Sequence, residues 1–241
     1  MIKIENISKQ FGKIKVLQEI TLHLESGQCI ALIGPNGCGK TTLIKSILGM
    51  VVPSSGNIFV QDKNIANAWE YRKSIGYMPQ IGRYPDNMTI GQVLDMMKDI
   101  RGDQYQDLDT ELHDSFQMDS LLNKRMGTLS GGTRQKVSAC IAFMFKPQIL
   151  ILDEPTAGLD PVSTEILKEK IQKEIANNKL IIITSHILSD LDELVSEIVY
   201  MEEGQLRFHK DIHALKAETG TDKLGKAIAQ VMLSSKASIY A

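Results

Sequence analysis

The feature that most constrains the fold is a glycine-rich stretch between an apolar run and a run with helical spacing. It reads "CIALIGPNGCGKTTLIKSILGM", with Gly34, Gly39, Lys40 and Thr41 in the fixed positions of a phosphate-binding loop. Glycines let consecutive backbone N–H groups point at phosphate oxygens, and the following helix adds the positive end of its dipole. The order strand, loop, helix favours this interpretation over a chance glycine turn and indicates a parallel α/β sheet.

Each residue type in the loop has a chemical reason to be there. Lys40 can reach the β- and γ-phosphates, and the Thr41 hydroxyl can ligate Mg²⁺. Cys38 stands at a helix N-terminus beside Lys40, which favours thiolate, so we expect it to be the thiol whose modification most affects activity. The alternative is that Cys38 is only a small, shielded loop residue. The loop residues expected to contact phosphate are Gly34, Pro35, Asn36, Gly37, Cys38, Gly39, Lys40, Thr41 and Thr42.

Composition narrows the functional class. A chain of 241 residues, 43% hydrophobic, suits one large domain or a domain with an inserted subdomain. The net charge of -2 gives no indication of a nucleic-acid partner. The three cysteines lack metal-ligand spacing and fit a reducing compartment. No run approaches ~18 apolar residues, and the start "MIKIENIS" does not resemble a signal peptide, so we expect no membrane span.

The order of the other patterns predicts an interrupted α/β domain. Strand-like runs occupy the N-terminus, from "IKIENI" through "CIALIG" to "GNIFVQD". Helical patterns follow, among them "TIGQVLDMMKDIR" with a capping box at Thr89 and Gln92, "LDTELHDSFQM" and "SGGTRQKVSACIAFMF". Strands return in "QILILDE", "LIIITSH" and "EIVYMEEGQLRF", and "TDKLGKAIAQVML" predicts a core-packing helix.

We therefore predict a P-loop NTPase core of α/β class, with an antiparallel β subdomain at the N-terminus and an inserted helical subdomain. The whole chain is expected to form one domain. Its predicted parts are a core made of 1–83 and 148–208, a helical subdomain at 84–147 and a C-terminal helical tail at 209–241.

Two adjacent carboxylates end the apolar strand "QILILDE". Burying acidic residues at the end of a strand costs free energy, so such residues are rare unless they bind a cation or another partner. A Mg²⁺ at the phosphate loop would be such a cation: Asp153 would hold the metal, through its water, and Glu154 would polarise the attacking water. The pattern is weak alone and becomes specific together with the phosphate loop.

Three single residues have both a functional and a structural interpretation. Gln80, after the strand "IGYM", can ligate Mg²⁺ or hold water, although one Gln by itself is uninformative. His186 follows "LIIITS" and would donate to the γ-phosphate; the alternative is a solvated residue after a capping Ser185. Phe11 would stack on adenine; the alternative is a contact in a satellite core.

A second stretch has the layout of an anion site. In "LSGGTRQK", Ser130 can cap a helix, while Gly131 and Gly132 allow a close approach of the backbone. A helix N-terminus of this kind attracts anions. The chain therefore carries two such sites, and its own nucleotide needs only one.

Taken together, these motifs resemble the ATP-binding subunits of ABC transporters over residues 1 to about 208. "GPNGCGKTT" is similar to the family's Walker A loop, "ILILDE" to Walker B, "LSGGT" to the signature and "TAGLD" to the D-loop, which assigns Asp160 to the nucleotide site. Gln80, His186 and Phe11 match the Q-loop, switch and A-loop positions. Thr133 and Cys38 depart from the usual residues, but neither change removes a backbone group, so we expect activity to survive.

The resemblance also implies the partners. In this family two subunits form a head-to-tail dimer around two ATP molecules, so each "LSGG" serves the neighbour's ATP; the neighbour would be a second copy or a similar subunit. ATP and Mg²⁺ are the implied cofactors. A separate integral-membrane permease subunit would hold the chain at the cytoplasmic face of the membrane.

Within the family, two long stretches of this chain look most like ATPases of copper-enzyme maturation in nitrous-oxide-reducing bacteria. These are 80–102 and 129–161. The alternatives belong to other classes: a soluble ABC-type ATPase without transport, and a P-loop kinase or GTPase. The first would need coiled coils or a second nucleotide domain in the chain, and the second would lack "LSGGT".

Overall fold

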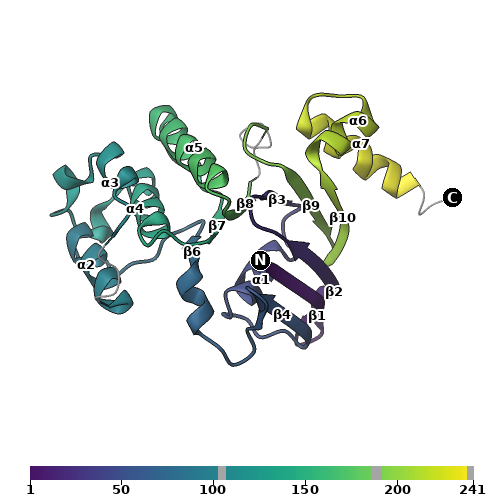
Figure 1. Cartoon of the computed structure of the whole chain (residues 1–241), viewed down its shortest axis with the longest axis horizontal. Coiled ribbons are helices and arrows are strands. Elements are labelled where there is room, and N and C mark those ends of the chain that lie inside the picture. Colours follow the sequence, from purple (N-terminus) through teal and green to yellow (C-terminus); the bar gives the residue numbers. More distant parts are fainter. Residues whose placement is uncertain (103–106, 186–191, 238–241) are drawn as a thin grey trace. The chain divides into compact units, whose positions relative to one another are not determined.

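The computed structural model describes residues 1–102, 107–185 and 192–237. It divides into two compact units. Unit 1 consists of Met1–Ala66 with Thr184–Ala241, and unit 2 of Asn67–Ile183. Figure 1 shows the helices and strands of both.

The N-terminal part of unit 1 is an antiparallel sheet in the order β2-β1-β4-β5. Period-two alternation builds it, because every second side chain of a strand faces the core, as Ile2, Ile4 and Leu22 do. Register shifts interrupt the pairing of β1 with β2. The strands are β1 (Ile2–Phe11), β2 (Ile14–Leu24), β4 (Ser55–Val60) and β5 (Lys63–Asn64).

The rest of unit 1 holds the strand of the phosphate loop. β3 pairs in parallel with β9, and β10 pairs antiparallel with β9, so this sheet is mixed. Glu203 and Gly204, both at positive φ, make the turn between β9 and β10. The elements are β3 (Cys29–Ile33), α1 (Lys40–Ile47), β9 (Glu197–Glu202), β10 (Gln205–Asp211), α6 (Ile212–Thr219) and α7 (Leu224–Ala237). The expected apolar face of α7 is buried at Leu224, Ala227, Ile228 and Val231, and its fifth residue, Met232, is half-buried.

Unit 2 contains strands in the order β8-β7-β6 and a run of helices between β6 and β7. The strands β7 and β8 are buried along their whole length and apolar up to their last residues, Asp153 and Thr184, as expected for strands covered on both faces. Its elements are β6 (Ile75–Met78), α2 (Ile90–Arg101), α3 (Glu111–Ser115), α4 (Gly131–Phe143), β7 (Ile149–Asp153), α5 (Pro161–Ala176) and β8 (Leu180–Thr184).

The predicted α/β class, with an antiparallel sheet and helices inserted between strands, is confirmed. The capping box at Thr89 and Gln92 is present at the start of α2. One helix is shorter than predicted: in "LDTELHDSFQM" only Glu111–Ser115 is helical. Gln117 adopts a left-handed conformation (φ 53°), which ends the regular helix before a 3₁₀ turn at Met118–Leu121. The limits 84–147 for a separate helical subdomain remain a prediction.

A buried cluster of ion pairs holds helix α5 to the chain before α3. The Lys170 side chain is only 5% exposed, and its ammonium lies 2.6 Å from a carboxylate oxygen of Asp109, 3.0 Å from one of Glu111 and 2.6 Å from one of Glu174. Burial lowers the pKa of Lys170, but the hydrogen bonds to these carboxylates outweigh it, so the pKa is raised.

In the described parts of the chain, the structure holds no helix that is long and apolar enough to cross a membrane.

Candidate functional site

The phosphate loop in unit 1 has a backbone that only glycine permits. Gly34 and Gly39 have φ values of 150° and 109°. A Cβ atom at Gly34 would lie 2.1 Å from the Met201 carbonyl oxygen, and one at Gly39 would lie 2.7 Å from that of Val16. Both distances are far shorter than van der Waals contact. The backbones of β9 and β2 therefore pack directly against the loop at these two glycines. At Gly37 (φ 79°) a Cβ would meet open space.

Lys40, at the start of helix α1, forms hydrogen bonds back to the loop. Its ammonium donates to the carbonyl oxygens of Gly34 at 2.6 Å and Pro35 at 3.1 Å. Lys40 is the first residue of α1. The N-cap residue, Gly39, makes no side-chain cap hydrogen bond, and the first turn of the helix has no acidic residue. An ammonium and uncapped N–H groups around a glycine cradle fit a phosphate chain.

Cys38 is buried, whereas a reactive thiol would have to be exposed to solvent. Its side chain is 3% exposed, and its sulfur is 3.9 Å from the Lys40 ammonium. A Cβ on Gly34 would come within 2.8 Å of this sulfur, so the thiol is packed under the loop. The structure therefore favours the shielded alternative over the expected reactive thiol.

Phe11, the predicted adenine platform, ends β1 and is 49% exposed. The Lys9 ammonium lies 5.0 Å from the centroid of its ring and also donates to the Val52 carbonyl at 2.7 Å. This cation interacts with the π-electrons of the ring. An exposed aromatic ring at a strand end fits stacking better than the alternative of a core contact.

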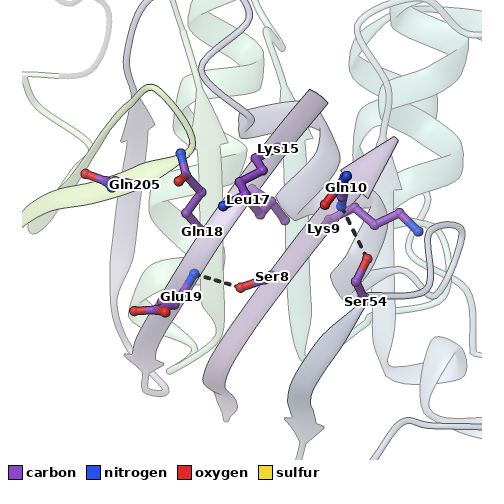
Figure 2. A pocket seen from close by; sticks show the side chains of 9 residues that line it. All are labelled: Ser8, Lys9, Gln10, Lys15, Leu17, Gln18, Glu19, Ser54 and Gln205. Carbon is purple, nitrogen blue, oxygen red and sulfur yellow. Dashed lines mark hydrogen bonds between the residues drawn. The ribbon is translucent and has the colours of Figure 1, made fainter. Parts of the chain in front are cut away.

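A cavity of about 330 Å³ lies where β1 and β2 pair irregularly. Figure 2 shows the Ser8 hydroxyl accepting from the Glu19 N–H, and that of Ser54 accepting from the Gln10 N–H. None of the lining residues belongs to the phosphate loop as the structure describes it. The cavity is lined by Ser8, Lys9, Gln10, Lys15, Leu17, Gln18, Glu19, Ser54 and Gln205.

In unit 2 the parallel pairing of β6 and β7 brings two predicted metal and catalytic segments to one sheet edge. Met78 is paired with Leu152, so Gln80 and Glu154 each follow two residues beyond this pair. Asp153, the last residue of β7, is buried, and Gln80 is exposed. This edge, where parallel strands end, is where ligands of α/β folds bind.

The charge of Asp153 affects the pKa of the neighbouring Tyr77 hydroxyl. Burial, followed by the charge of Asp153, raises the pKa of Tyr77 to about 12. Glu154 has a left-handed backbone (φ 52°), which costs about 1 kcal/mol or more for a non-glycine residue. Such strain is typical of functional sites. His186, the predicted switch residue, lies outside the described residues.

The signature stretch begins helix α4 as predicted. The Ser130 hydroxyl oxygen accepts from the Thr133 N–H at 3.2 Å and lies 2.9 Å from the Thr133 hydroxyl oxygen. If the Thr133 hydroxyl is the donor of this pair, the Ser130 proton is available for an external acceptor. A Cβ at Gly131 would meet nothing within 4 Å, so this face of the helix start is open.

The other side of the α4 start is closed against the segment that follows Glu154. A Cβ at Gly132 would lie 2.5 Å from the Gly158 carbonyl oxygen. The buried Gln135 amide donates to the carbonyls of Glu154 at 3.1 Å and Pro155 at 3.4 Å. Sequence reasoning missed Gln135, because one glutamine within a helical run carries no signal of burial.

Asp160 has partners within its own chain. It caps helix α5 by accepting from the Ser163 N–H at 2.9 Å and hydroxyl at 2.6 Å, and it pairs with the Lys136 ammonium at 3.0 Å. The hydrogen bonds from Ser163, and then that from Lys136, hold the pKa of Asp160 well below its usual range. Its predicted contact with nucleotide remains a prediction.

The family model described as "ABC transporter" matches residues 17–157. The chain belongs to the ABC transporter family. The Nod factor export ATP-binding protein I of Rhizobium sp. (strain N33) is 31% identical over 90% of this chain and 73% of that protein. The uncharacterized ABC transporter ATP-binding protein YxlF of Bacillus subtilis (strain 168) is 29% identical over 92% of this chain and 75% of that protein.

Solved structures agree with this assignment. An ATP-binding subunit of an ABC transporter superposes with a TM-score of 0.89 at 26% identity, covering 96% of this chain and 99% of that one. The dimeric bacterial cassette MJ0796 shares the fold, with a TM-score of 0.76 at 21% identity over 88% of this chain and 98% of that one. This ABC chain is thus an ATP-binding transporter subunit and an ATPase.

The narrower resemblance to copper-maturation ATPases has no support in these relatives. Within residues 1–102, 107–185 and 192–237, no group of three or more His, Cys, Asp or Glu side chains is placed to hold a metal ion. The relatives also do not support the alternative of a non-transport ATPase.

Proposed function

We propose that this ABC subunit hydrolyses ATP in a head-to-tail dimer and thereby drives a separate integral-membrane permease at the cytoplasmic face of the membrane. The partner is a second copy or a similar subunit. The observation that supports this most is the open face at Gly131 beside Ser130, because it offers an anion site that the chain's own loop does not need. The dimer of the cassette MJ0796 is a precedent from a protein of the same fold.

The loop 34–42 holds the phosphates of ATP, and Phe11 carries the adenine. Lys40 leaves its loop carbonyls for the β- and γ-phosphate oxygens, which are stronger partners because they are charged. Thr41, Gln80 and Asp153 would hold Mg²⁺, whose preference for oxygen donors their side chains satisfy. When bound, the ion offsets the charge that develops on the phosphates.

Glu154 accepts a proton from the attacking water, and His186 donates to the γ-phosphate. Ser130, Gly131 and Gly132 contact the γ-phosphate of the neighbour's ATP, with Asp160 close to the same site. A helix N-terminus stabilises an anion by up to ~2 kcal/mol, so closure depends on whether the γ-phosphate is present. Hydrolysis removes that stabilisation, and the dimer opens.

The matched variants Glu154→Gln and Lys40→Ala separate the two halves of this proposal. Glu154→Gln keeps the shape of the side chain and loses the base, so it binds MgATP with unchanged affinity and hydrolyses it at least ~10²-fold more slowly. Lys40→Ala instead weakens nucleotide binding, measured by equilibrium titration. Near-normal turnover in the Glu154→Gln protein would show that the base is another group.

A further inference from the structure

The start of helix α4 and the segment 154–160 are joined at three points. Backbone contact at Gly132 and Gly158 forms the first, the Gln135 amide the second and the Lys136–Asp160 ion pair the third. These three contacts occur within five residues of α4, immediately after Ser130. These contacts tie the residues that follow the signature serine to the segment that begins with Glu154.

Gln135 is the contact closest to the catalytic chemistry. Its side chain is 4% exposed, so its hydrogen bonds form away from water. It donates to the carbonyl oxygens of two consecutive peptide groups, that of Glu154 and that of Pro155. The carbonyl carbon of Glu154 is bonded to the Cα that carries the carboxylate side chain, so a hydrogen bond to this carbonyl restrains the backbone from which the carboxylate projects, a backbone already held at the unusual φ of 52°. The Glu154 carbonyl also accepts from the Ala157 N–H at 3.1 Å, which forms a turn but does not reach α4.

We propose that Gln135 is a positioning residue for hydrolysis: it couples the signature serine, when that serine is docked on the neighbour's ATP, to the orientation of Glu154 in its own subunit. The inference rests on the proposed function of Ser130 and Glu154. It gives a physical route by which closure at one nucleotide sets the base for the other. A subunit whose signature is undocked holds its base away from the attacking geometry.

Two substitutions at Gln135 distinguish a hydrogen-bond role from a space-filling one. Gln135→Leu keeps similar volume and removes the donor. Gln135→Glu keeps the shape and replaces the donor by an acceptor that faces two carbonyl oxygens. If the donor matters, kcat falls about 10-fold or more in Gln135→Leu and further in Gln135→Glu, because small misplacements of a base are costly. If only shape matters, Gln135→Glu is the better tolerated of the two.

The control is Ser138→Ala on the same helix. Ser138 is also buried. The substitution removes the hydrogen bond that the Ser138 hydroxyl accepts from the Tyr84 hydroxyl at 3.1 Å and the one that it donates to the Arg134 carbonyl at 3.1 Å, and neither involves Glu154. The variant should be destabilised toward denaturant to a similar degree as Gln135→Leu, with kcat unchanged. All proteins are compared for KM, equilibrium affinity for MgATP, kcat and ATP-driven crosslinking across the dimer.

The expected result is a loss of kcat that is larger for Gln135→Glu than for Gln135→Leu, with nucleotide affinity and crosslinking at wild-type levels. Equal kcat in the wild type and both Gln135 variants would overturn the proposal. So would a loss of crosslinking in parallel with kcat, which would place Gln135 in the signature contact itself. Absence of crosslinking in the wild type would contradict the head-to-tail dimer, while the order of kcat values would still test Gln135.

Discussion

The two signature glycines provide a matched pair of substitutions with opposite expected effects. Gly131 and Gly132 are the first two residues of α4, and alanine at either favours the helix. A methyl group at Gly131 enters open space, whereas one at Gly132 lies 2.5 Å from the Gly158 carbonyl oxygen. The chain should therefore tolerate alanine at the first position and resist it at the second.

The magnitudes follow from these distances. Glycine costs up to ~1 kcal/mol relative to alanine within a helix, and less in the first turn, so Gly131→Ala should stabilise the isolated subunit by a few tenths of a kcal/mol. Gly132→Ala gains the same amount but must move the Gly158 backbone by about 1 Å to restore ordinary contact, at a cost of about 1–3 kcal/mol. The net change is a loss of stability.

Denaturant unfolding without nucleotide measures these changes, and ATP-driven crosslinking measures closure. Gly131→Ala should unfold at slightly higher denaturant concentration yet crosslink poorly, since its methyl group occupies the face offered to the neighbour's phosphate. Gly132→Ala should unfold earlier. Equal stabilities of the two variants would refute the interpretation of Gly132 as an intrachain contact. Normal closure by Gly131→Ala would refute the proposed use of the open face.

Further predictions concern the interior of unit 2 and the loop thiol. Lys170→Met should lower the free energy of unfolding by about 3 kcal/mol, because it leaves the mostly buried Asp109 carboxylate without its cation and leaves the buried Glu174 with Lys179 alone; thermal unfolding measures this. Burial raises the pKa of Glu174, but the hydrogen bonds from Lys170 and Lys179 outweigh it and the pKa falls below its ordinary 4.5. As the pH falls, Glu174 therefore takes up a proton in the unfolded chain before it does so in the folded chain. The stability that Glu174 contributes is present above pH 4.5 and is lost as the pH falls below this value. A flat acid profile would contradict this. Cys38 should react with alkylating reagents only slowly in the folded protein, and rapid labelling at native pH would contradict its burial.

Much of the fold was predictable because it rests on short-range patterns. The glycine loop, the buried strand ending at Asp153 and the cap at Ser130 each depend on residues adjacent in sequence, so their spacing alone indicates strand, loop and helix. The shortened helix at Glu111–Ser115 could not be foreseen in this way. Its end at Gln117 depends on a left-handed conformation that glutamine rarely adopts.

For the candidate site, the residue types were predictable from the sequence, but the contacts that orient them were not. The residue types that handle phosphate, metal and water are few, and their order along the chain indicated each role. The contacts that orient them come from residues far apart in sequence. Gln135 reaches the Glu154 carbonyl, and Gly132 meets Gly158, only because α4 packs against the segment after β7. Burial of Cys38 likewise depends on Gly34 and the loop above it.

The central claim is that each signature serves the neighbour's ATP, and a mixed dimer tests it most directly. One protein carries Lys40→Ala and keeps an intact signature; the other carries Ser130→Arg and keeps an intact loop. In each homodimer both sites are damaged. In the mixed dimer one site combines the intact Lys40 with the intact Ser130, and both lesions fall in the other site.

The two proteins are mixed with MgATP, and closure is followed by crosslinking across the interface, because a dimer with one damaged site can close even if it turns over slowly. We expect the mixture to crosslink well above either protein alone. Crosslinking no greater than that of the homodimers would mean that each subunit completes its own site, and Ser130, Gly131 and Gly132 would then have no role at a neighbour's ATP.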